Sequence, residues 1–277
     1  DVGNLMDVIA IDSSNPIYQK IQGRSLVELY SGIGVSDTTT FTPRSDSVPF
    51  QFSGSEIDMF WSLSANEAYR ILGGGNTMQN ELLWKSPAYI EYGESQGEPE
   101  ENACYWLRSP WSSAGNGAYS VKRTGYIGMY SVNASNYAVR PAFILKFSSD
   151  TVKVNYDETE NYYYLEMGTH NGNPVRWRYV ADVTNGVASA TRFVPSSTNA
   201  PDTTKGKGMF VLETCLVDSV SEITNGGATS TQDHIVVYQN KTIRSGDNVC
   251  VKNSDGTASN ILSNDYAASD VREFLTA

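Results

Sequence analysis

The chain has 277 residues, of which 40% are hydrophobic and 11% aromatic, enough to bury the core of one large domain or two modest ones. Its formal net charge of −11 argues against nucleic-acid binding, which needs basic stripes that neutralise phosphates, and against anionic membrane surfaces. No apolar run approaches the roughly 18 residues of a transmembrane helix, so we expect no membrane insertion. Because the first residue is Asp1, we expect a processed chain or a piece of a longer polypeptide.

The chain has three cysteines and two histidines, so few side chains could bind a metal or take part in redox chemistry. Cys104, Cys215 and Cys250 are far apart and odd in number, and no Cys-x-x-Cys pair occurs, so neither a zinc site nor a disulfide framework is expected. His170 lies in a turn rich in Gly and Asn, and His234 directly precedes a predicted strand. We therefore predict a protein that is not an enzyme, with no catalytic residue, cofactor or metal.

In the first part of the chain, the sequence predicts short elements separated by long loops. Ser64 and Glu67 form a capping box, in which each side chain accepts a bond from the other's backbone N–H, so a helix is expected to start there. Before it we expect, in chain order, an extended arm at residues 8–11, a helix start at 13–16, a short helix at 25–30 and a core strand at 57–63.

The second part of the chain predicts mainly antiparallel strands. An acidic turn is expected at residues 157–161 and another turn at 221–230, and a final helix begins at Asp270 with Ser269 or Asp270 as its cap. The expected strands lie at residues 146–156, 162–167, 175–180, 208–213, 235–238 and 248–252.

Between these parts, residues 104–145 form two apolar anchors around a polar, aromatic-rich segment. Alternation at residues 118–122 and 126–130, broken by Gly and Asn, predicts short antiparallel strands and turns, and we call residues 111–137 the meander. The expected structural anchors are Trp106, Arg108, Arg140 and Phe143, with an arginine bonding backbone carbonyls or a carboxylate in the core.

The meander is rich in Tyr, Ser and Asn, which is the composition that recognition loops favour, because Tyr supplies rigid contact area and Ser and Asn supply adaptable hydrogen bonds. The alternative is an ordinary turn-rich segment, in which Asn, Ser and Gly serve turn geometry alone. The predicted ligand-binding residues are Trp111, Ser112, Ser113, Asn116, Tyr119, Tyr126, Tyr130, Asn133, Ser135, Asn136 and Tyr137.

The pair of motifs WLRSP at residues 106–110 and VRPAF at residues 139–143 resembles a bacterial and phage-borne family of uncharacterised domains. The resemblance implies a C-type-lectin-like fold, which is shared with formylglycine-generating enzymes and with the variable proteins of diversity-generating retroelements. In those variable proteins adenine mutagenesis enriches Asn, Tyr, Ser and Asp in the corresponding segment.

Two features of these related groups are not matched here. The formylglycine-generating enzymes are copper oxidases that use a pair of cysteines, and Cys104 has no visible sequence partner. The calcium-dependent lectins use a Glu-Pro-Asn loop, which residues 98–102 resemble only loosely. The resemblance therefore does not extend to oxidase activity or to a metal site.

The order of the segments differs from that of the family. A typical member opens with segments resembling residues 164–180, 209–212 and 269–275, and closes with those resembling 60–68, WLRSP and VRPAF. Here the closing half is residues 1–148 and the opening half residues 155–277. The chain could be a circular permutant closing on itself, a piece of a tandem array, or a subunit whose halves complete those of other molecules.

These observations lead us to expect an α+β, β-dominated, C-type-lectin-like fold, with residues 1–277 forming one permuted domain; the alternative is two sub-domains split near residues 149–160. The expected function is non-catalytic binding of a protein or glycan receptor by an extracellular, cell-surface or virion-borne module. One alternative is a self-associating structural subunit of a shell, fibre or pilus-like assembly, and another is a diverged glycosidase or oxidase.

Overall fold

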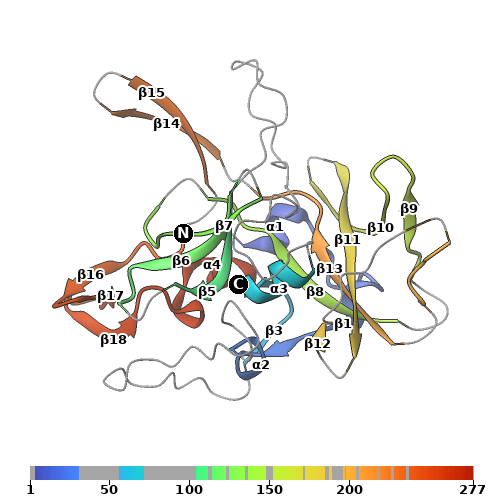
Figure 1. The fold of residues 1–277 in the computed structure, drawn as a ribbon, viewed down its shortest axis with the longest axis horizontal. Helices are drawn as coiled ribbons and strands as arrows, with labels where there is room; N and C mark the ends of the chain where they lie inside the picture. The colour runs from blue at the N-terminus through green and yellow to red at the C-terminus, as the bar shows by residue number, and fades with distance from the viewer. Residues whose placement is uncertain are drawn as a thin grey trace.

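The chain folds around one central antiparallel sheet, with smaller sheets and short helices at its sides (Figure 1). This computed structural model describes residues 4–30, 56–71, 104–111, 114–122, 125–134, 137–147, 152–170, 172–184, 187–188, 196, 198–203, 206–216, 219–225, 228–234 and 237–276. Strands predominate over helices, which confirms the predicted α+β, β-dominated class.

The central sheet contains strands from both halves of the chain. Its neighbouring strands follow the order β1 (Ile21–Gln22), β8 (Pro141–Lys146), β13 (Lys207–Leu212), β11 (Asn173–Thr184), β10 (Tyr162–His170) and β9 (Asn155–Asp157). Two short strands pair with members of this row, β4 (Trp61–Ser62) with β8 and β12 (Val187–Ala188) with β11.

The two halves meet where β8 pairs with β13. Phe143 lies opposite Phe210, and their rings stack with centroids 5.4 Å apart. Trp177 of β11 packs edge-on against Phe143 at 4.9 Å, and all three side chains are buried. Pro141 has no N–H to donate, which is tolerated because it begins β8. One hydrophobic core therefore includes residues from near both ends of the chain.

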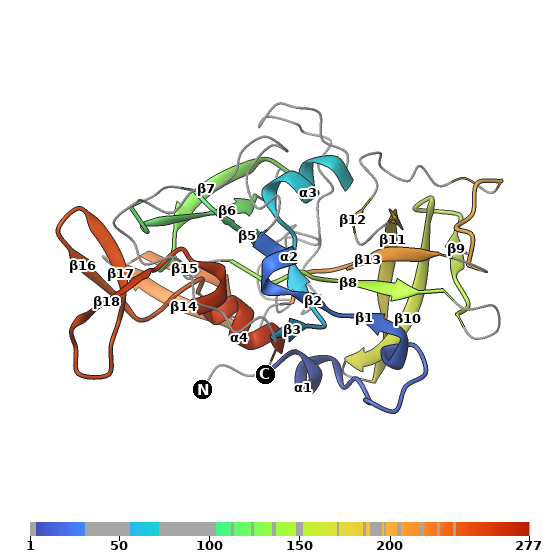
Figure 2. The same ribbon diagram turned by 90° about the horizontal axis from the view of Figure 1, so that it is seen from below.

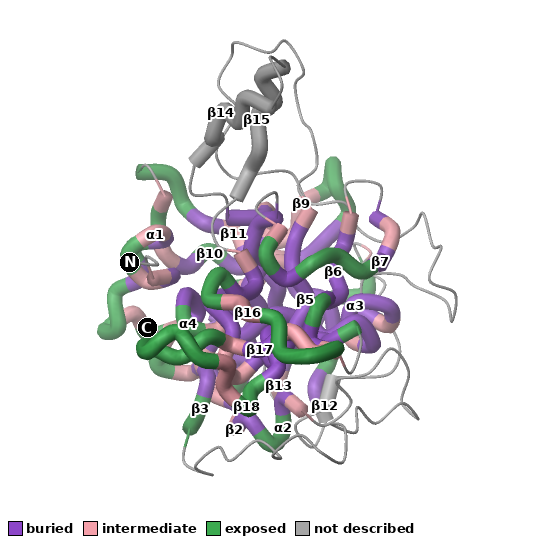
Figure 3. Tube along the Cα trace, turned by 90° about the vertical axis from the view of Figure 1, so that its left-hand side faces the viewer, coloured by how far each residue is buried: buried purple, intermediate pink, exposed green. Residues whose placement is uncertain are grey.

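The meander supplies two strands of a separate three-stranded sheet, β6 (Gly117–Val121) and β7 (Ile127–Ser131), and the first anchor supplies the third, β5 (Tyr105–Pro110), in the order β5-β6-β7. Beside it lies the sheet of β16 (Thr242–Ser245), β17 (Asn248–Lys252) and β18 (Ala258–Leu262), which Figure 2 places at one end of the molecule. Figure 3 shows that the trace of this end is mostly exposed, whereas the buried trace runs through the middle.

The remaining strands form two short pairs. β2 (Arg24–Ser25) pairs with β3 (Ile57–Asp58). The hairpin of β14 (Ser219–Asn225) and β15 (Ala228–His234) projects from the body in Figure 1. The prediction of a turn at residues 221–230 was therefore wrong, because Asn225 and Ala228 end two strands that extend well beyond the turn itself.

The helices are short, and three of them match predictions. The helix predicted at residues 25–30 is α2 (Leu26–Tyr30). The capping box is confirmed at α3 (Ala65–Ile71), and Ser269 caps α4 (Asp270–Thr276) by accepting a bond from the backbone N–H of Arg272. The other helical segments among the described residues are α1 (Leu5–Ile9), η1 (Tyr18–Lys20) and η3 (Tyr266–Ala268).

Two predictions near the N-terminus need correction. The expected extended arm is instead the end of α1, because the Asn4 side chain caps the helix at the Asp7 N–H and Leu5 and Ile9 face the core one turn apart. The expected core strand at residues 57–63 is split into β3 and β4, with a bend between them, so its two pieces pair with different strands.

Candidate recognition surface

The first end of the meander is held by a fully buried arginine. The Arg108 Nε donates to the backbone oxygen of Leu29 at 2.9 Å, and its Nη1 donates to that of Ser62 at 2.8 Å and forms an ion pair with Glu67. A charged side chain is stable in a core only when it is paired and hydrogen-bonded in this way. Arg108 thus connects β5 to α2, β4 and α3.

Glu67 is shared between the α3 cap and two arginines. Its carboxylate accepts from the Ser64 N–H at 3.0 Å and from the Arg24 Nη1 at 3.0 Å, in addition to Arg108. Burial would raise the pKa of Glu67, but the charges of Arg108 and Arg24 and these hydrogen bonds lower it to about 2. Arg24, Glu67 and Arg108, which we call the polar joint, therefore hold a charged carboxylate inside the protein.

The second end of the meander is held by Arg140, which connects the two halves of the chain. Its Nε donates to the Leu212 backbone oxygen at 2.8 Å and its Nη2 to that of Glu213 at 3.3 Å. Its Nη1 donates to the Tyr105 hydroxyl at 3.2 Å, and its guanidinium lies 5.2 Å from the centre of that ring. Arg140 is buried, as are the other anchors Trp106 and Phe143.

Below the surface of the meander lies a layer of stacked aromatic rings. Trp106 stacks on Tyr137 at 4.3 Å and meets Tyr238 edge-on at 5.4 Å. Tyr130 packs on the outer side of Tyr137, with centroids 5.0 Å apart. Such pairs contribute about 0.5–1.5 kcal/mol beyond the area that they bury, so the sheet has a rigid base.

Two predicted ligand-binding residues are buried, and one of them, Tyr137, belongs to this base. Tyr137 is only 1% exposed, and Tyr119 is also buried, so neither side chain faces solvent. Burial raises the pKa of both hydroxyls. The Tyr-, Ser- and Asn-rich composition assigned these tyrosines to the binding surface, but Tyr137 is covered by Trp106 and Tyr130, whose packing the sequence did not show.

The exposed part of the meander carries large apolar side chains on both faces of its sheet. Six large hydrophobic side chains are exposed among the described residues, and three of them are Trp111 at 43%, Tyr130 at 38% and Met129 at 37%. The Trp111 indole lies over Gly117 of β6, where a Cβ would be in ordinary van der Waals contact with the ring at 3.5 Å. Together with the polar residues below, we call this the recognition surface.

A lysine lies between two tyrosines on the face of the sheet that carries Tyr130, opposite the face of Trp111 and Met129. The Lys122 ammonium is 4.7 Å from the centre of the Tyr130 ring and 5.8 Å from that of Tyr126. Gly128 makes this possible, because a Cβ there would lie within 3.0 Å of both Lys122 and Tyr126. Contacts between a cation and a tyrosine face contribute about 0.5–1 kcal/mol at exposed sites.

Polar groups complete the recognition surface. Asn116, Ser131 and Asn133 are exposed, and the Ser131 hydroxyl donates to the Asn133 side-chain oxygen at 2.6 Å. Ser112, Ser113, Ser135 and Asn136, which were also predicted to bind, lie outside the described residues. Sequence reasoning missed Lys122 and Met129, although strand alternation places Lys122 across from Tyr126 and Met129 across from Tyr119.

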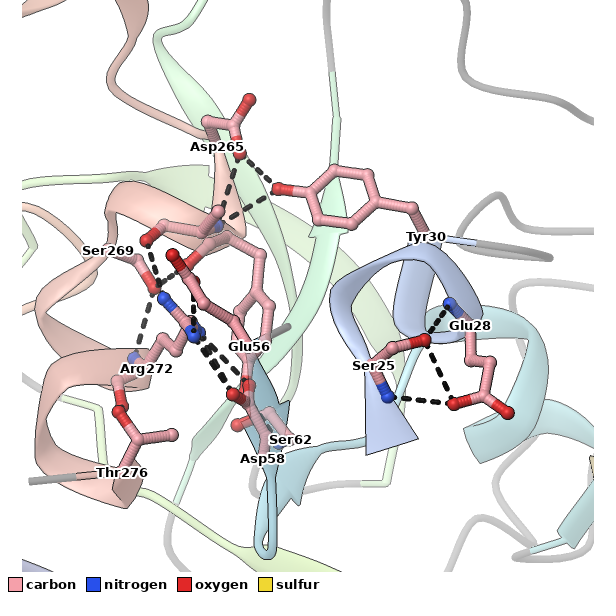
Figure 4. Close-up of polar contacts among 12 residues, drawn as sticks. Ser25, Glu28, Tyr30, Glu56, Asp58, Ser62, Asp265, Ser269, Arg272 and Thr276 are labelled. Carbon is pink, nitrogen blue, oxygen red and sulfur yellow. Dashed lines mark hydrogen bonds and ion pairs between the residues drawn. The ribbon is translucent and has the colours of Figure 1, made fainter. Parts of the chain in front are cut away.

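A second group of polar contacts surrounds α4 (Figure 4). The Arg272 guanidinium donates to both carboxylate oxygens of Asp58, at 2.9 to 3.3 Å, and to Glu56 at 3.0 Å. The Tyr30 hydroxyl donates to Asp265, whose carboxylate also accepts from the Ala267 N–H. These contacts join the N-terminal helices and strands to the C-terminal helix.

Metal and disulfide chemistry find no support in the described part of the chain. No group of three His, Cys, Asp or Glu side chains there is arranged to hold a metal ion. Cys104, Cys215 and Cys250 are all described, and none forms a disulfide. None of the described helices has the length and hydrophobicity to cross a membrane.

Comparison with known families gives one match. A family model described as Domain of unknown function (DUF6273) matches residues 40–147, which include both anchors and the whole meander. No curated protein and no solved structure matches the chain. The segment that carries the recognition surface therefore lies within the part of this chain that is similar to this family.

Proposed function

We propose that this protein is a non-catalytic binding module that recognises a protein or glycan ligand through its recognition surface. The observation that carries the proposal is the exposure of Trp111 and Met129 on one face of the β6–β7 pair and of Tyr130 on the other, in a segment whose two ends are fixed by buried arginines. Trp, Tyr and Met are enriched where proteins bind partners, and Trp and Tyr often supply most of the binding energy.

The rigid base supports binding rather than a turn-rich segment without function. A surface that is already ordered loses little conformational entropy when it binds, so more of its contact energy becomes affinity. The stack of Trp106, Tyr137 and Tyr130 provides this order. Asn116, Ser131 and Asn133 add exposed donors and acceptors beside it.

We further propose that the fold is C-type-lectin-like with its halves in permuted order, in a module located outside the cell, at the cell surface or on a virion. The pairing of β8 with β13 and the bonds from Arg140 to residues 212 and 213 support closure within one chain. Both join the segment that would close a family domain to the segment that would open it.

The test uses arrays of glycans and of extracellular protein domains as probes. A double variant, Trp111→Ala with Tyr130→Ser, should lose binding to any ligand that the native protein captures. Val27→Ser is the matched control, since Val27 is 58% exposed and lies on α2, outside the sheet of the meander. Equal binding by the double variant and the native protein would contradict the proposal.

Natural variation offers a separate test of the resemblance to diversified proteins. Sequencing this gene across a population should show variation concentrated in codons 111–137, at adenine-bearing codons for Tyr, Asn and Ser. A segment as uniform as the rest of the gene would exclude diversification and leave a ligand that does not vary.

A further inference from the structure

A buried carboxyl with neutral hydrogen-bond partners lies next to the meander's sheet. Asp265 directly precedes η3, which packs against β5, and it is 8% exposed. Its Oδ1 accepts from the Tyr30 hydroxyl and from the Ala267 N–H at 3.1 Å, and the Tyr30 hydroxyl also accepts from that N–H at 2.9 Å (Figure 4). We call the contact between Tyr30 and Asp265 the latch. A carboxyl buried among neutral groups favours its protonated form, because ionisation places an uncompensated charge away from water.

No described cation balances this carboxyl. The ionisable groups on the elements around it are Tyr30 of α2, Tyr238 before β16, Tyr266 of η3, Arg108 of β5 and Arg272 of α4, with Glu67, Asp58 and Glu56 as the partners of the two arginines. None of the described Lys, Arg or His side chains forms an ion pair with Asp265. Burial raises the pKa of Asp265 to about 7, and the bonds from Tyr30 and Ala267 lower it less. Asp265 therefore changes charge near neutral pH.

The last turn of α2 places the latch beside a bond that fixes the first end of the meander. Tyr30 is the last residue of α2, and the backbone oxygen of the preceding residue, Leu29, accepts from the Arg108 Nε at 2.9 Å. Arg108 is fully buried in β5, and its other bond to a backbone oxygen is the one to Ser62. The latch and this support of β5 are therefore one residue apart.

On the other side of the latch, the residue before Asp265 supports β6. The Asn264 side-chain nitrogen donates to the Gly117 backbone oxygen at 3.0 Å, and Asn264 is only 1% exposed. The same oxygen accepts from the Trp111 N–H at 3.0 Å, and the Trp111 indole lies over Gly117. The latch is therefore also one residue from the bond that supports β6 beneath Trp111.

We propose that the latch is a pH-sensitive device that orders the recognition surface while Asp265 is protonated and releases it when Asp265 ionises. An ionised Asp265 takes up water, because its neutral partners compensate the charge poorly, and Tyr30 then separates from it. The bonds from Leu29 to β5 and from Asn264 to β6 lose their fixed positions as a result. Ligand binding is therefore stronger in mildly acidic than in mildly alkaline solution, an inference that rests on the proposed function.

The direction of the effect depends on which form of the latch holds the proton. The closed latch holds Asp265 with a pKa of about 7, and opening returns the carboxyl to water, where its ordinary pKa is 3.8. The stability of the closed form is therefore fully present below about pH 3.8 and is lost as the pH rises through about 7. Between pH 5 and pH 7 the opening equilibrium rises by up to about tenfold per pH unit, a total of about a hundredfold, and above pH 7 it changes little.

Backbone hydrogen exchange followed by mass spectrometry measures this opening without any ligand. Peptides from residues 105–121 report on the meander's sheet, and peptides from residues 162–184 report on the central sheet. The native protein is compared with Asp265→Asn at equal pH, which cancels the intrinsic pH dependence of exchange. For residues 105–121, the native exchange rate divided by that of Asp265→Asn should rise by up to about a hundredfold between pH 5 and pH 8.

Asp182→Asn is the matched control. Asp182 also accepts from a tyrosine hydroxyl, that of Tyr179, but it lies on β11 in the central sheet. In this variant the exchange of residues 105–121 should equal that of the native protein at both pH values.

Two results would overturn the latch. One is a ratio that stays constant from pH 5 to pH 8. The other is exchange of residues 105–121 at pH 8 that is as slow as that of residues 162–184, because the meander's sheet would then open only when the whole protein unfolds. If Asp265→Asn does not fold, Tyr30→Phe decides. It removes the hydroxyl and keeps the ring, so residues 105–121 should exchange faster than in the native protein at pH 5, and unchanged exchange overturns the proposal.

A ligand captured on the arrays separates the latch from the proposed function. The native protein should lose affinity for it between pH 5 and pH 8, and Asp265→Asn should lose less. The same pH dependence in both proteins would overturn the control of binding. Exchange that responds as expected, together with no captured ligand, would remove the proposed function and leave the latch.

Discussion

The polar joint and the recognition surface use their side chains for opposite purposes. In the joint, Arg24, Glu67 and Arg108 are largely buried and bonded to one another or to backbone oxygens. On the recognition surface, Trp111 and Tyr130 are exposed, and Lys122 contacts ring faces rather than a carboxylate. The joint connects segments that are far apart in sequence, whereas Trp111, Tyr130 and Lys122 contact neighbouring residues of the meander.

This difference shows how residues serving the fold are separated from residues serving a ligand. Removing one partner of a buried ion pair leaves a charge without compensation, which strongly destabilises a protein. Removing an exposed side chain outside such a network changes stability little. Variants in the two regions should therefore differ in which property they alter, and the four predictions below test that separation.

The largest loss of stability is expected for Arg108→Met. The variant leaves the buried Glu67 carboxylate with Arg24 as its remaining cation and leaves two core carbonyls without a donor. The free energy of unfolding should fall by about 3–5 kcal/mol, as measured by urea denaturation. Arg244→Met, on the exposed strand β16, is the control and should change it by less than about 0.5 kcal/mol. Equal losses in both variants would show that the joint does not hold the fold together.

A pH-dependent change is expected from Asp265. Burial raises the pKa of this carboxyl from 3.8 to about 7, even though hydrogen bonds from Tyr30 and Ala267 lower it. The folded state thus binds a proton that the unfolded state releases. The associated stability is fully present below about pH 3.8 and is lost as the pH rises through about 7.

Asp265→Asn should remove this dependence, because the amide oxygen still accepts both hydrogen bonds but does not ionise. At pH 8 the variant should be more stable than the native protein, by at most about 4 kcal/mol, and near pH 4 the difference should vanish. Urea denaturation of both proteins from pH 4 to pH 8 measures this difference in the free energy of unfolding. Parallel curves for the two proteins would contradict the assignment.

A smaller loss is expected at the contact between α4 and β3. Arg272→Ala leaves the buried Asp58 carboxylate without its two-bond partner and should lower the free energy of unfolding by about 2–3 kcal/mol. Arg272→Lys keeps the charge but not the paired geometry, so its loss should be about half as large. Thermal melting of both variants compares their stabilities. A higher melting temperature for Arg272→Ala than for Arg272→Lys would contradict the prediction.

The smallest effect on stability is expected on the recognition surface. Trp111→Ala with Tyr130→Ser removes two exposed side chains, so the free energy of unfolding should fall by only about 1 kcal/mol in total. The same double variant should abolish ligand binding. A loss comparable with that of Arg108→Met would place these residues in the fold rather than in recognition.

The sequence predicted the local elements whose signals are contained within a few residues. The capping box of Ser64 and Glu67, the start of α4 and the alternating strands of the meander were all predicted correctly. Signals that depend on distant partners were not predicted. Residues 8–11 were predicted to be an extended arm because all four are apolar. The helical spacing of Leu5 and Ile9 becomes visible only when α1 is counted from its cap, Asn4.

Composition and alternation by themselves determined that this chain is rich in antiparallel strands and presents a Tyr- and Asn-rich meander between apolar anchors. The tertiary structure alone decided which of those tyrosines meets solvent. Tyr130 and Tyr137 have the same side chain in the same segment, yet only Tyr137 is covered, by Trp106 of β5. The burial of a side chain depends on which residues of other segments pack against it, and a local sequence pattern does not contain that information.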